Sequence, residues 1–295
     1  MEEFKYIGKE ITRNDEKEKV TGAARYVDDL DFGPNLLYAE IIESPHPHAL
    51  IKKIDTSEAE KVEGVVKVVT GKDFPYKFGL YTKDRYIFAQ DRVRFIGEQV
   101  AAVVARDPKI AQKASKLVKV EYEPLPPVFD PLEAVKEGSP IIHPDLENYY
   151  RVPWFFAKAG TNIAHHRKVR RGDVEKGFKE ADYVFEDTYR IPRFAHCCME
   201  THISVGFYDL SGRLTLYNSS QSPHVQKSLI ADALSPLGIS EKDVRVVTPY
   251  VGGGFGGKAG VTMEVIAAAL AVACKGNPVK VRWRRDQEFY NTYMR

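Results

Sequence analysis

The stretch VRVVTPYVGGGFGGKAGVTMEVIAAALAVACK, residues 244–275, constrains the fold of this chain more than any other segment. It begins with a strand pattern, ends with an apolar helix pattern at 263–275, and holds five glycines in the six positions 252–257 between them. Such a junction lets backbone amides approach a ligand closely, and a helix N-terminus adds partial positive charge. The stretch therefore predicts a site for an anion or an oxygen-rich ligand, and the alternative is a tight turn with close helix–strand packing.

Two nucleotide-binding patterns overlap the glycines, and neither fits well. The phosphate-loop pattern G-x-x-x-x-G-K-[ST] fails at its last position, where Ala259 replaces the hydroxyl residue that binds magnesium. The dinucleotide pattern G-x-G-x-x-G is present, but Asp286 lies farther along than its ribose-binding acid usually does. Phe255 would also crowd a pyrophosphate. A nicotinamide-dependent dehydrogenase that uses this loop is kept as an alternative function.

Composition and charge exclude several classes of protein. The 295 residues carry a net charge of +2, which gives no general attraction to nucleic acid, and the basic cluster at 165–171 has no aromatic-rich face beside it. No apolar run is long enough to span a membrane, and the N-terminus lacks the apolar core of a secretory signal. Three cysteines argue against a disulfide framework and for a reducing, cytoplasmic compartment.

Residues 1–130 alternate strand and helix patterns and are interpreted as one mixed α/β unit. Strands are expected at 65–70, 99–105 and 118–122. The second of these is apolar throughout, as in a strand buried on both faces. A short helix is expected at 55–63, and Asp107 and Pro108 begin another.

Residues 131–170 form an irregular connection rich in proline, histidine and aromatic residues, and residues 171–295 alternate again. The expected elements are a helix at 172–182, a half-buried strand at 183–191, a hairpin turning at 210–212, a helix opened by Ser222 and Pro223, and strands at 244–248 and 279–283. The chain stops at NTYMR without a cap, which suggests a cut through a domain.

Histidines and cysteines near residue 200 do not form a recognised metal motif. His196, Glu200 and His202 could meet on a strand, but their spacing is not H-E-x-x-H, and histidines with ordinary hydrogen bonds are commoner. The adjacent Cys197 and Cys198 have no C-x-x-C spacing, so packing is favoured over a redox role. No metal-ligating residue and no iron–sulfur cluster are predicted for this chain.

Two charged features have competing interpretations. Lys258 could contact an anionic cofactor or close a salt bridge, and the sequence favours neither. The second feature is interpreted as a solvated ion-pair face, made of Arg282, Arg284, Arg285, Asp286 and Glu288.

Several segments, in order, resemble the molybdenum-binding subunit of the xanthine dehydrogenase and aldehyde oxidoreductase family, the molybdenum hydroxylases. They are VTGAARYVDDL (20–30), FIGEQVAAVVARDPKIAQKASKLVKVEYEPLPPV (95–128), RGDVEKGFKEADYVFEDTYRIP (171–192), QSPHVQKSLIADALSPLGISEKDVRVVTPYVGGGFGGK (221–258) and VKVRWRRDQEF (279–289). The resemblance implies an α+β chain. Residues 1–130 would form an α/β-hammerhead domain, and residues 171–295 the N-terminal part of a molybdopterin-binding domain.

The resemblance also assigns a cofactor site. Gln221 corresponds to a glutamine that hydrogen-bonds an oxygen ligand of molybdenum. The loop residues that would approach the metal and the pterin are Gly252, Gly253, Gly254, Phe255, Gly256 and Gly257. No catalytic residue is expected in this chain, because the family's glutamate base lies in the missing C-terminal portion or on a partner. Ala259 replaces a glutamate of purine-oxidising members, which argues against a xanthine-type pocket.

The implied function is the front portion of a molybdenum hydroxylase that oxidises an N-heteroaromatic or aldehyde substrate, with water as the oxygen source. The cofactor would be molybdopterin or its cytosine dinucleotide. Expected partners are a second molybdenum-domain chain, an iron–sulfur subunit with 2Fe-2S clusters, and an FAD subunit. A non-catalytic scaffold or assembly subunit is a further alternative.

Overall fold

The computed structural model describes residues 4–292, so the ends of the MEEFKYIGKE and NTYMR segments lie outside the described range. A seven-stranded mixed sheet forms the centre, in the order β11-β10-β9-β12-β1-β7-β3. Its strands are β1 (Leu37–Glu43), β3 (Val65–Thr70), β7 (Gln99–Ala105), β9 (Ile203–Tyr208), β10 (Leu214–Asn218), β11 (Val244–Val247) and β12 (Pro278–Arg282). Because β12 pairs in parallel with β1, strands from both regions of the chain share this sheet.

Two smaller sheets and a set of short helices complete the fold. The smaller sheets contain β2 (Ala49–Asp55), β6 (Arg92–Val93) and β8 (Lys119–Pro124), and β4 (Lys77–Phe78) with β5 (Arg85–Tyr86). The α-helices are α1 (Glu16–Val20), α2 (Ser57–Glu60), α3 (Pro108–Ser115), α4 (Pro131–Ala134), α5 (Val174–Glu180), α6 (Pro223–Leu234), α7 (Glu264–Ala273) and α8 (Arg285–Asn291). The 3-10 turns are η1 (Val27–Asp29), η2 (Gly71–Asp73), η3 (Leu146–Asn148), η4 (Ser235–Leu237) and η5 (Glu241–Asp243). The α+β class expected from the sequence is confirmed.

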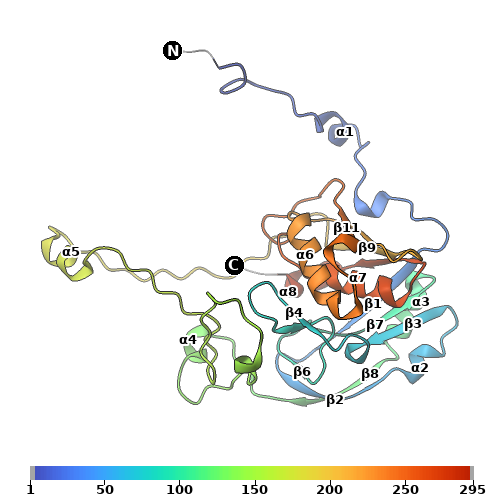
Figure 1. Cartoon of the computed structure of the whole chain (residues 1–295), viewed down its shortest axis with the longest axis horizontal. Coiled ribbons are helices and arrows are strands. Elements are labelled where there is room, and N and C mark those ends of the chain that lie inside the picture. Colours follow the sequence, from blue (N-terminus) through green and yellow to red (C-terminus); the bar gives the residue numbers. More distant parts are fainter. Residues whose placement is uncertain (1–3, 293–295) are drawn as a thin grey trace.

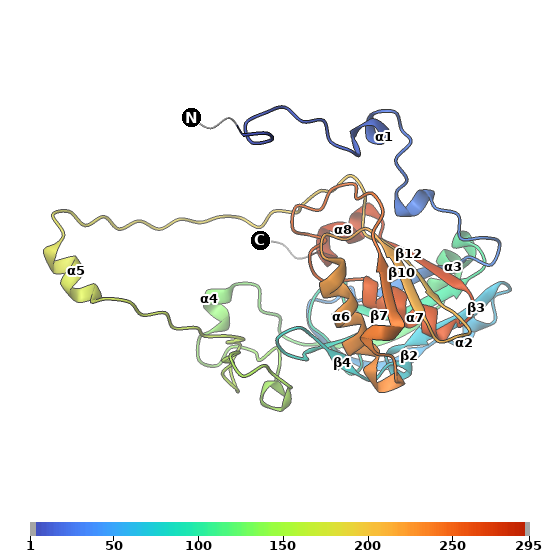
Figure 2. The same ribbon diagram turned by 45° about the horizontal axis from the view of Figure 1, so that its top comes forward.

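Helices cover both faces of the central sheet (Figure 2). Every residue of β7 is buried, as its apolar sequence predicts. Ala102 and Val104 join the large core around α7, whereas Val103 packs with Ala114 of α3. Since successive strand residues point to opposite faces, α3 and α7 lie on opposite sides of the sheet.

A glycine in β9 lets the helix that follows the glycine loop pack unusually close to the sheet. A Cβ on Gly206 would lie 2.7 Å from the backbone oxygen of Ala267 in α7. Helix α7 is buried over almost its whole length. The end of the glycine loop is therefore attached to a tightly fixed element.

Several local predictions are confirmed. β3 and β7 have the expected bounds, Asp107 caps α3 through the backbone N–H groups of Lys109 and Ile110, and the expected hairpin forms β9 and β10. The prediction of a strand at 183–191 is wrong. This segment forms no strand and is exposed, because no strand of the described chain lies beside it.

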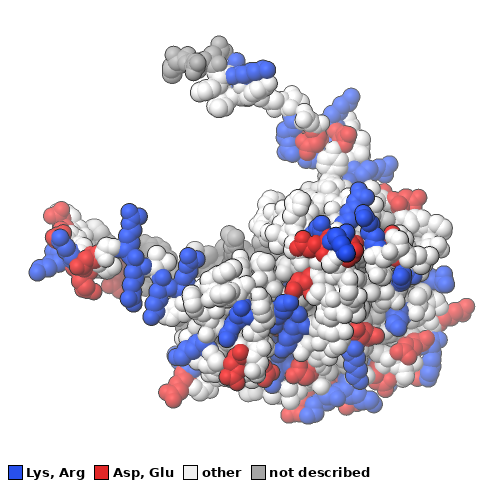
Figure 3. All heavy atoms as spheres, viewed as in Figure 1, with Lys and Arg blue, Asp and Glu red and all other residues white. Residues whose placement is uncertain are grey.

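Two segments extend from the globular body in both views (Figures 1 and 2). One is the N-terminal segment that carries α1, and the other carries α5. Lys and Arg side chains are interspersed with Asp and Glu over the face in Figure 3, so this face has no large patch of one sign. No helix within residues 4–292 has the length and apolarity needed to cross a bilayer.

Candidate functional site

The glycine loop and Gln221 meet at one edge of the central sheet. β10 and β11 are parallel, so the segments that follow them, which contain Gln221 and residues 252–257, leave the sheet at the same edge. β9 is antiparallel to β10, which brings the preceding segment 196–202 there as well. The carboxyl ends of neighbouring parallel strands are a common place for ligand sites.

The Gln221 side chain holds the loop in its shape. Its Oε1 accepts hydrogen bonds from the backbone N–H groups of Gly256 (2.9 Å) and Lys258 (3.2 Å). A Cβ on Gly254 would lie 2.5 Å from this oxygen, so a larger residue there would displace the carboxamide. Nε2 of Gln221 has no hydrogen-bond partner among residues 4–292, which leaves two N–H donors available.

Three successive backbone N–H groups in the loop are also available. Those of Gly253, Gly254 and Phe255 donate to no acceptor within the described part of the chain. Phe255 has a φ of +51°, a left-handed conformation that is rare for a bulky residue, and its side chain is 74% exposed. Strained backbone and successive unpaired donors together are typical of a binding loop for an oxygen-rich ligand.

A buried ion pair lies beneath the loop. Lys258 is completely buried, and its Nζ contacts Glu200 Oε2 (2.9 Å) and Ser219 Oγ (2.7 Å). The same Glu200 oxygen accepts a hydrogen bond from the backbone N–H of Gly252 (2.8 Å). Of the two interpretations of Lys258, the structure contains the salt bridge. The sequence alone does not point to Ser219, and it suggests Glu200 only as a metal ligand.

His202 and Glu288 form a second buried pair behind the loop. Nδ1 of His202 lies 2.8 Å from Glu288 Oε1, and Nε2 lies 3.1 Å from the backbone oxygen of Gly257. Both ring nitrogens face oxygen acceptors. The interpretation of Glu288 as part of a solvated face is wrong, because it is buried against His202. The outward arginines behave as expected: Arg284, for example, pairs with Asp286 and Glu40.

Replacing Glu288 with glutamine is expected to destabilise the protein in a pH-dependent way. Burial opposes ionisation of Glu288, but hydrogen bonds from His202 outweigh it, so its pKa is lowered from 4.5. A lowered folded-state pKa means that the carboxylate stabilises the fold above pH 4.5, and that this contribution is lost as the pH falls through the folded-state pKa. Urea unfolding of both proteins between about pH 7 and about pH 3 should give curves that converge in acid. A pH-independent difference would contradict the assignment.

His196 and the cysteines make no metal site. Among residues 4–292, no group of three or more His, Cys, Asp or Glu side chains is arranged to hold a metal ion. His196 instead packs on the loop, since a Cβ on Gly257 would lie 3.0 Å from its ring. Burial raises the pKa of the Cys198 thiol, which keeps it protonated and agrees with a packing role.

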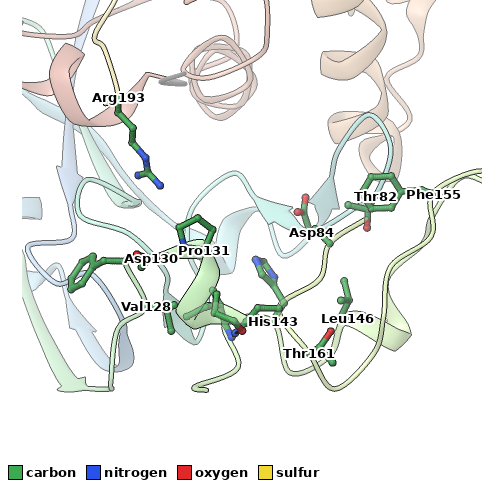
Figure 4. Close-up of a pocket in the computed structure, with 15 residues that line it drawn as sticks. Thr82, Asp84, Val128, Asp130, Pro131, His143, Leu146, Phe155, Thr161 and Arg193 are labelled. Atoms are coloured by element: carbon green, nitrogen blue, oxygen red, sulfur yellow. Dashed lines mark hydrogen bonds between the residues drawn. The ribbon is translucent and has the colours of Figure 1, made fainter. Parts of the chain in front are cut away.

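Two cavities lie on this side of the chain, and neither encloses the loop. One, of about 340 Å³, lies between the irregular connection and the segment of Thr82 and Asp84 (Figure 4). Burial, followed by the nearby Arg94, lowers the pKa of His143 in its wall to about 4, so this imidazole is neutral at pH 7. The second, of about 350 Å³, is bounded by residues 259–261, α6 and residues 78–85. Only the second reaches the end of the glycine loop.

Comparison with known proteins identifies both halves of the chain. Residues 21–126 match the aldehyde oxidase and xanthine dehydrogenase a/b hammerhead domain. Residues 155–295 match the molybdopterin cofactor-binding domain. The chain belongs to the xanthine dehydrogenase and aldehyde oxidoreductase family. The resemblance inferred from the sequence is thereby confirmed.

Relatives in this family are considerably longer than the chain. It is 34% identical over 287 residues to the nicotinate dehydrogenase large molybdopterin subunit of Eubacterium barkeri, covering 97% of this chain and 63% of that protein. It is 33% identical over 290 residues to the xanthine dehydrogenase molybdenum-binding subunit of Escherichia coli O157:H7. This match covers 94% of this chain and 36% of that subunit. The structure of the aldehyde oxidoreductase from Desulfovibrio gigas superposes on this chain with a TM-score of 0.82 at 27% identity. The superposition covers 96% of this chain and 31% of that protein.

Proposed function

We propose that the loop 252–257 and Gln221 hold the molybdenum cofactor of a molybdenum hydroxylase, and that this chain forms the front portion of its molybdenum-binding subunit. The observation that carries the proposal is the set of free donors at one edge of the sheet, within the described residues: Gln221 Nε2 and the N–H groups of Gly253, Gly254 and Phe255. The cofactor carries oxygen-rich groups, which suit such donors. When bound, it supplies the oxidation of a substrate carbon with oxygen from water.

The residues of this chain bind and orient in this proposal, and none acts as the catalytic base. Gln221 both shapes the loop through Oε1 and presents Nε2 to an oxygen of the cofactor. Lys258, which is fully buried, and Glu200, whose side chain is 15% exposed, fix the loop from below. A base would come from the remainder of the subunit, on this polypeptide or on a second molybdenum-domain chain.

The substrate would reach the loop through the second cavity. Its wall contains Ala259 together with apolar side chains, among them Leu80, Tyr81 and Phe155. With alanine rather than glutamate at 259, this wall favours an aldehyde or a less polar N-heteroaromatic over a xanthine-type substrate. We assign 2Fe-2S clusters and FAD to partner subunits.

The form of the cofactor, the location and the domain boundaries complete the proposal. Molybdopterin and its cytosine dinucleotide would fit the same donors. Three unpaired cysteines support a cytoplasmic location. We place the hammerhead domain at 1–130, the connection at 131–170, and the molybdopterin-binding portion at 171–295.

Replacing Gln221 with alanine tests the proposal. Loss of a side chain that supports a metal centre typically lowers metal affinity or activity by about 10–100-fold, and we expect a fall of that size in bound molybdenum. The measurement is elemental analysis of the purified native complex with its co-purifying chains identified by mass. If Gln221→Ala changes neither the molybdenum content nor the turnover of the complex, a scaffold role is favoured. NAD bound in place of molybdenum would favour a nicotinamide-dependent dehydrogenase.

A further inference from the structure

The segment that follows α5 has a strand sequence but no strand neighbours. Residues 183–195 form no helix or strand, and their backbone groups make no hydrogen bond within the described part of the chain. In both ribbon views this segment runs outside the globular body (Figures 1 and 2). An unpaired extended backbone presents N–H and C=O groups that another strand can bind.

Side chains along this segment divide into an apolar and a polar face. At alternate positions, four large apolar side chains are each 81–89% exposed: Tyr183, Phe185, Tyr189 and Ile191. The rings of Tyr183 and Phe185 stack with centroids 6.5 Å apart, so these two side chains already share one side. The intervening positions are Val184, Glu186, Thr188 and Arg190, so the second face is mostly polar, and Asp187 interrupts the apolar face. This period of two is typical of a strand with one face on a core and one toward solvent.

Helix α5 extends the same apolar surface. Val174 and Phe178 are exposed, and with residues 181–185 they border a hollow of about 350 Å³. Contiguous exposed apolar surface of this kind marks an interaction site. We call residues 174–191 the docking arm.

We propose that residues 183–191 of the docking arm form a β-strand on the polypeptide that supplies the remainder of the molybdopterin-binding domain. This inference rests on the proposed function. The arm lies within the part of the chain that matches this domain, and 96% of the chain superposes on only 31% of the aldehyde oxidoreductase from Desulfovibrio gigas. A large polypeptide is therefore available as the occupant.

The C-terminal end of the arm connects this occupant to the glycine loop through a short stretch of chain. Residue 191 is separated from His196 by no more than about 18 Å of extended chain. His196 packs directly on Gly257. A polypeptide paired with residues 183–191 would thus lie within reach of the open side of the loop and could contribute the residues that this chain lacks.

Hydrogen–deuterium exchange on the full chain, alone and in the complex purified through a tag on it, tests the proposal. The amides of 183–191 should exchange rapidly in the chain alone and at least about tenfold more slowly in the complex, because strand pairing protects them. Unchanged exchange in the complex would overturn the proposal. So would isolation of the chain with no other polypeptide, or a homodimer of the chain in which 183–191 is protected.

Two matched variants assign the contact to the apolar face. Phe185→Ser should weaken assembly at least about tenfold, as loss of a buried interface aromatic does, whereas Thr188→Ser on the polar face should leave it unchanged. Phe185 is 89% exposed, so its loss should not alter thermal unfolding of the chain alone. Equal assembly of both variants would contradict the proposal.

The molybdenum content of the same complex separates this inference from the proposed function. A complex that contains molybdenum but leaves 183–191 unprotected would overturn the docking arm alone. Protection of 183–191 in a complex without molybdenum would overturn the cofactor assignment and retain the strand pairing.

Discussion

Replacing Lys258 with methionine is expected to lower the free energy of unfolding by about 3–5 kcal/mol, the usual cost of removing one partner from a buried ion pair. Methionine fills a similar volume but leaves the carboxylate of Glu200 without its cation. Lys258 Nζ also donates to Ser219 Oγ, which would lose this donor. Chemical denaturation of the purified chain measures the change.

Two further variants separate the buried charge from a general effect of losing a lysine. Lys61→Met removes an exposed pair with Glu58 at 2.7 Å and should cause no measurable change, because exposed pairs contribute little. Adding Glu200→Gln to Lys258→Met should recover part of the lost stability, since it removes the uncompensated carboxylate. Equal effects of Lys258→Met and Lys61→Met would show that Lys258 makes no effective buried pair.

Much of the fold can be predicted because its signals are local. An unbroken apolar run at residues 99–105 indicates a strand buried on both faces, and Asp107 with Pro108 begins α3 with its own side-chain cap. The position of the glycine loop is equally local, since it follows from adjacent residues in one strand–helix junction, although its shape also depends on Gln221. Each of these predictions needs only the chemistry of adjacent residues.

The remainder depends on contacts between distant residues. β1 contains Glu40 and Glu43 and carries no clear strand pattern, yet it pairs with both β7 and β12. The charged neighbours of Glu288 predict a solvated residue, but His202, 86 residues away, buries it. The sequence at 183–191 is amphipathic, but whether it becomes a strand depends on a neighbour that the described chain does not contain.

The candidate site is predictable in part for the same reason. Family resemblance identifies Gln221 and the loop, and the structure brings them into contact. The ion pair under the loop is not predicted, because no sequence signal distinguishes Glu200 from other acids as the partner of a buried lysine. A cation placed between a glycine loop and an apolar helix does require a buried acid, so Lys258 is the available clue.

Replacing Gly254 with alanine is expected to weaken cofactor binding by about 10–100-fold, as much as Gln221→Ala does, because either change removes the support that the Gln221 carboxamide gives to the site. The added Cβ would lie 2.5 Å from Gln221 Oε1 and closer still to Cδ. The carboxamide must then move, which breaks its hydrogen bonds from Gly256 and Lys258 and misplaces Nε2. Elemental analysis of the purified complex measures the loss.

Combining Gly254→Ala with Gln221→Ala distinguishes a displaced side chain from a disrupted loop. Truncating Gln221 removes the atoms that the new Cβ would meet, so thermal unfolding of the double variant should match that of Gln221→Ala alone, a non-additive result expected of residues in contact. Molybdenum binding should remain low in the double variant, because no carboxamide is left to present Nε2 to the cofactor. Recovery of molybdenum would mean that the loop amides suffice and that Gln221 serves only to shape them.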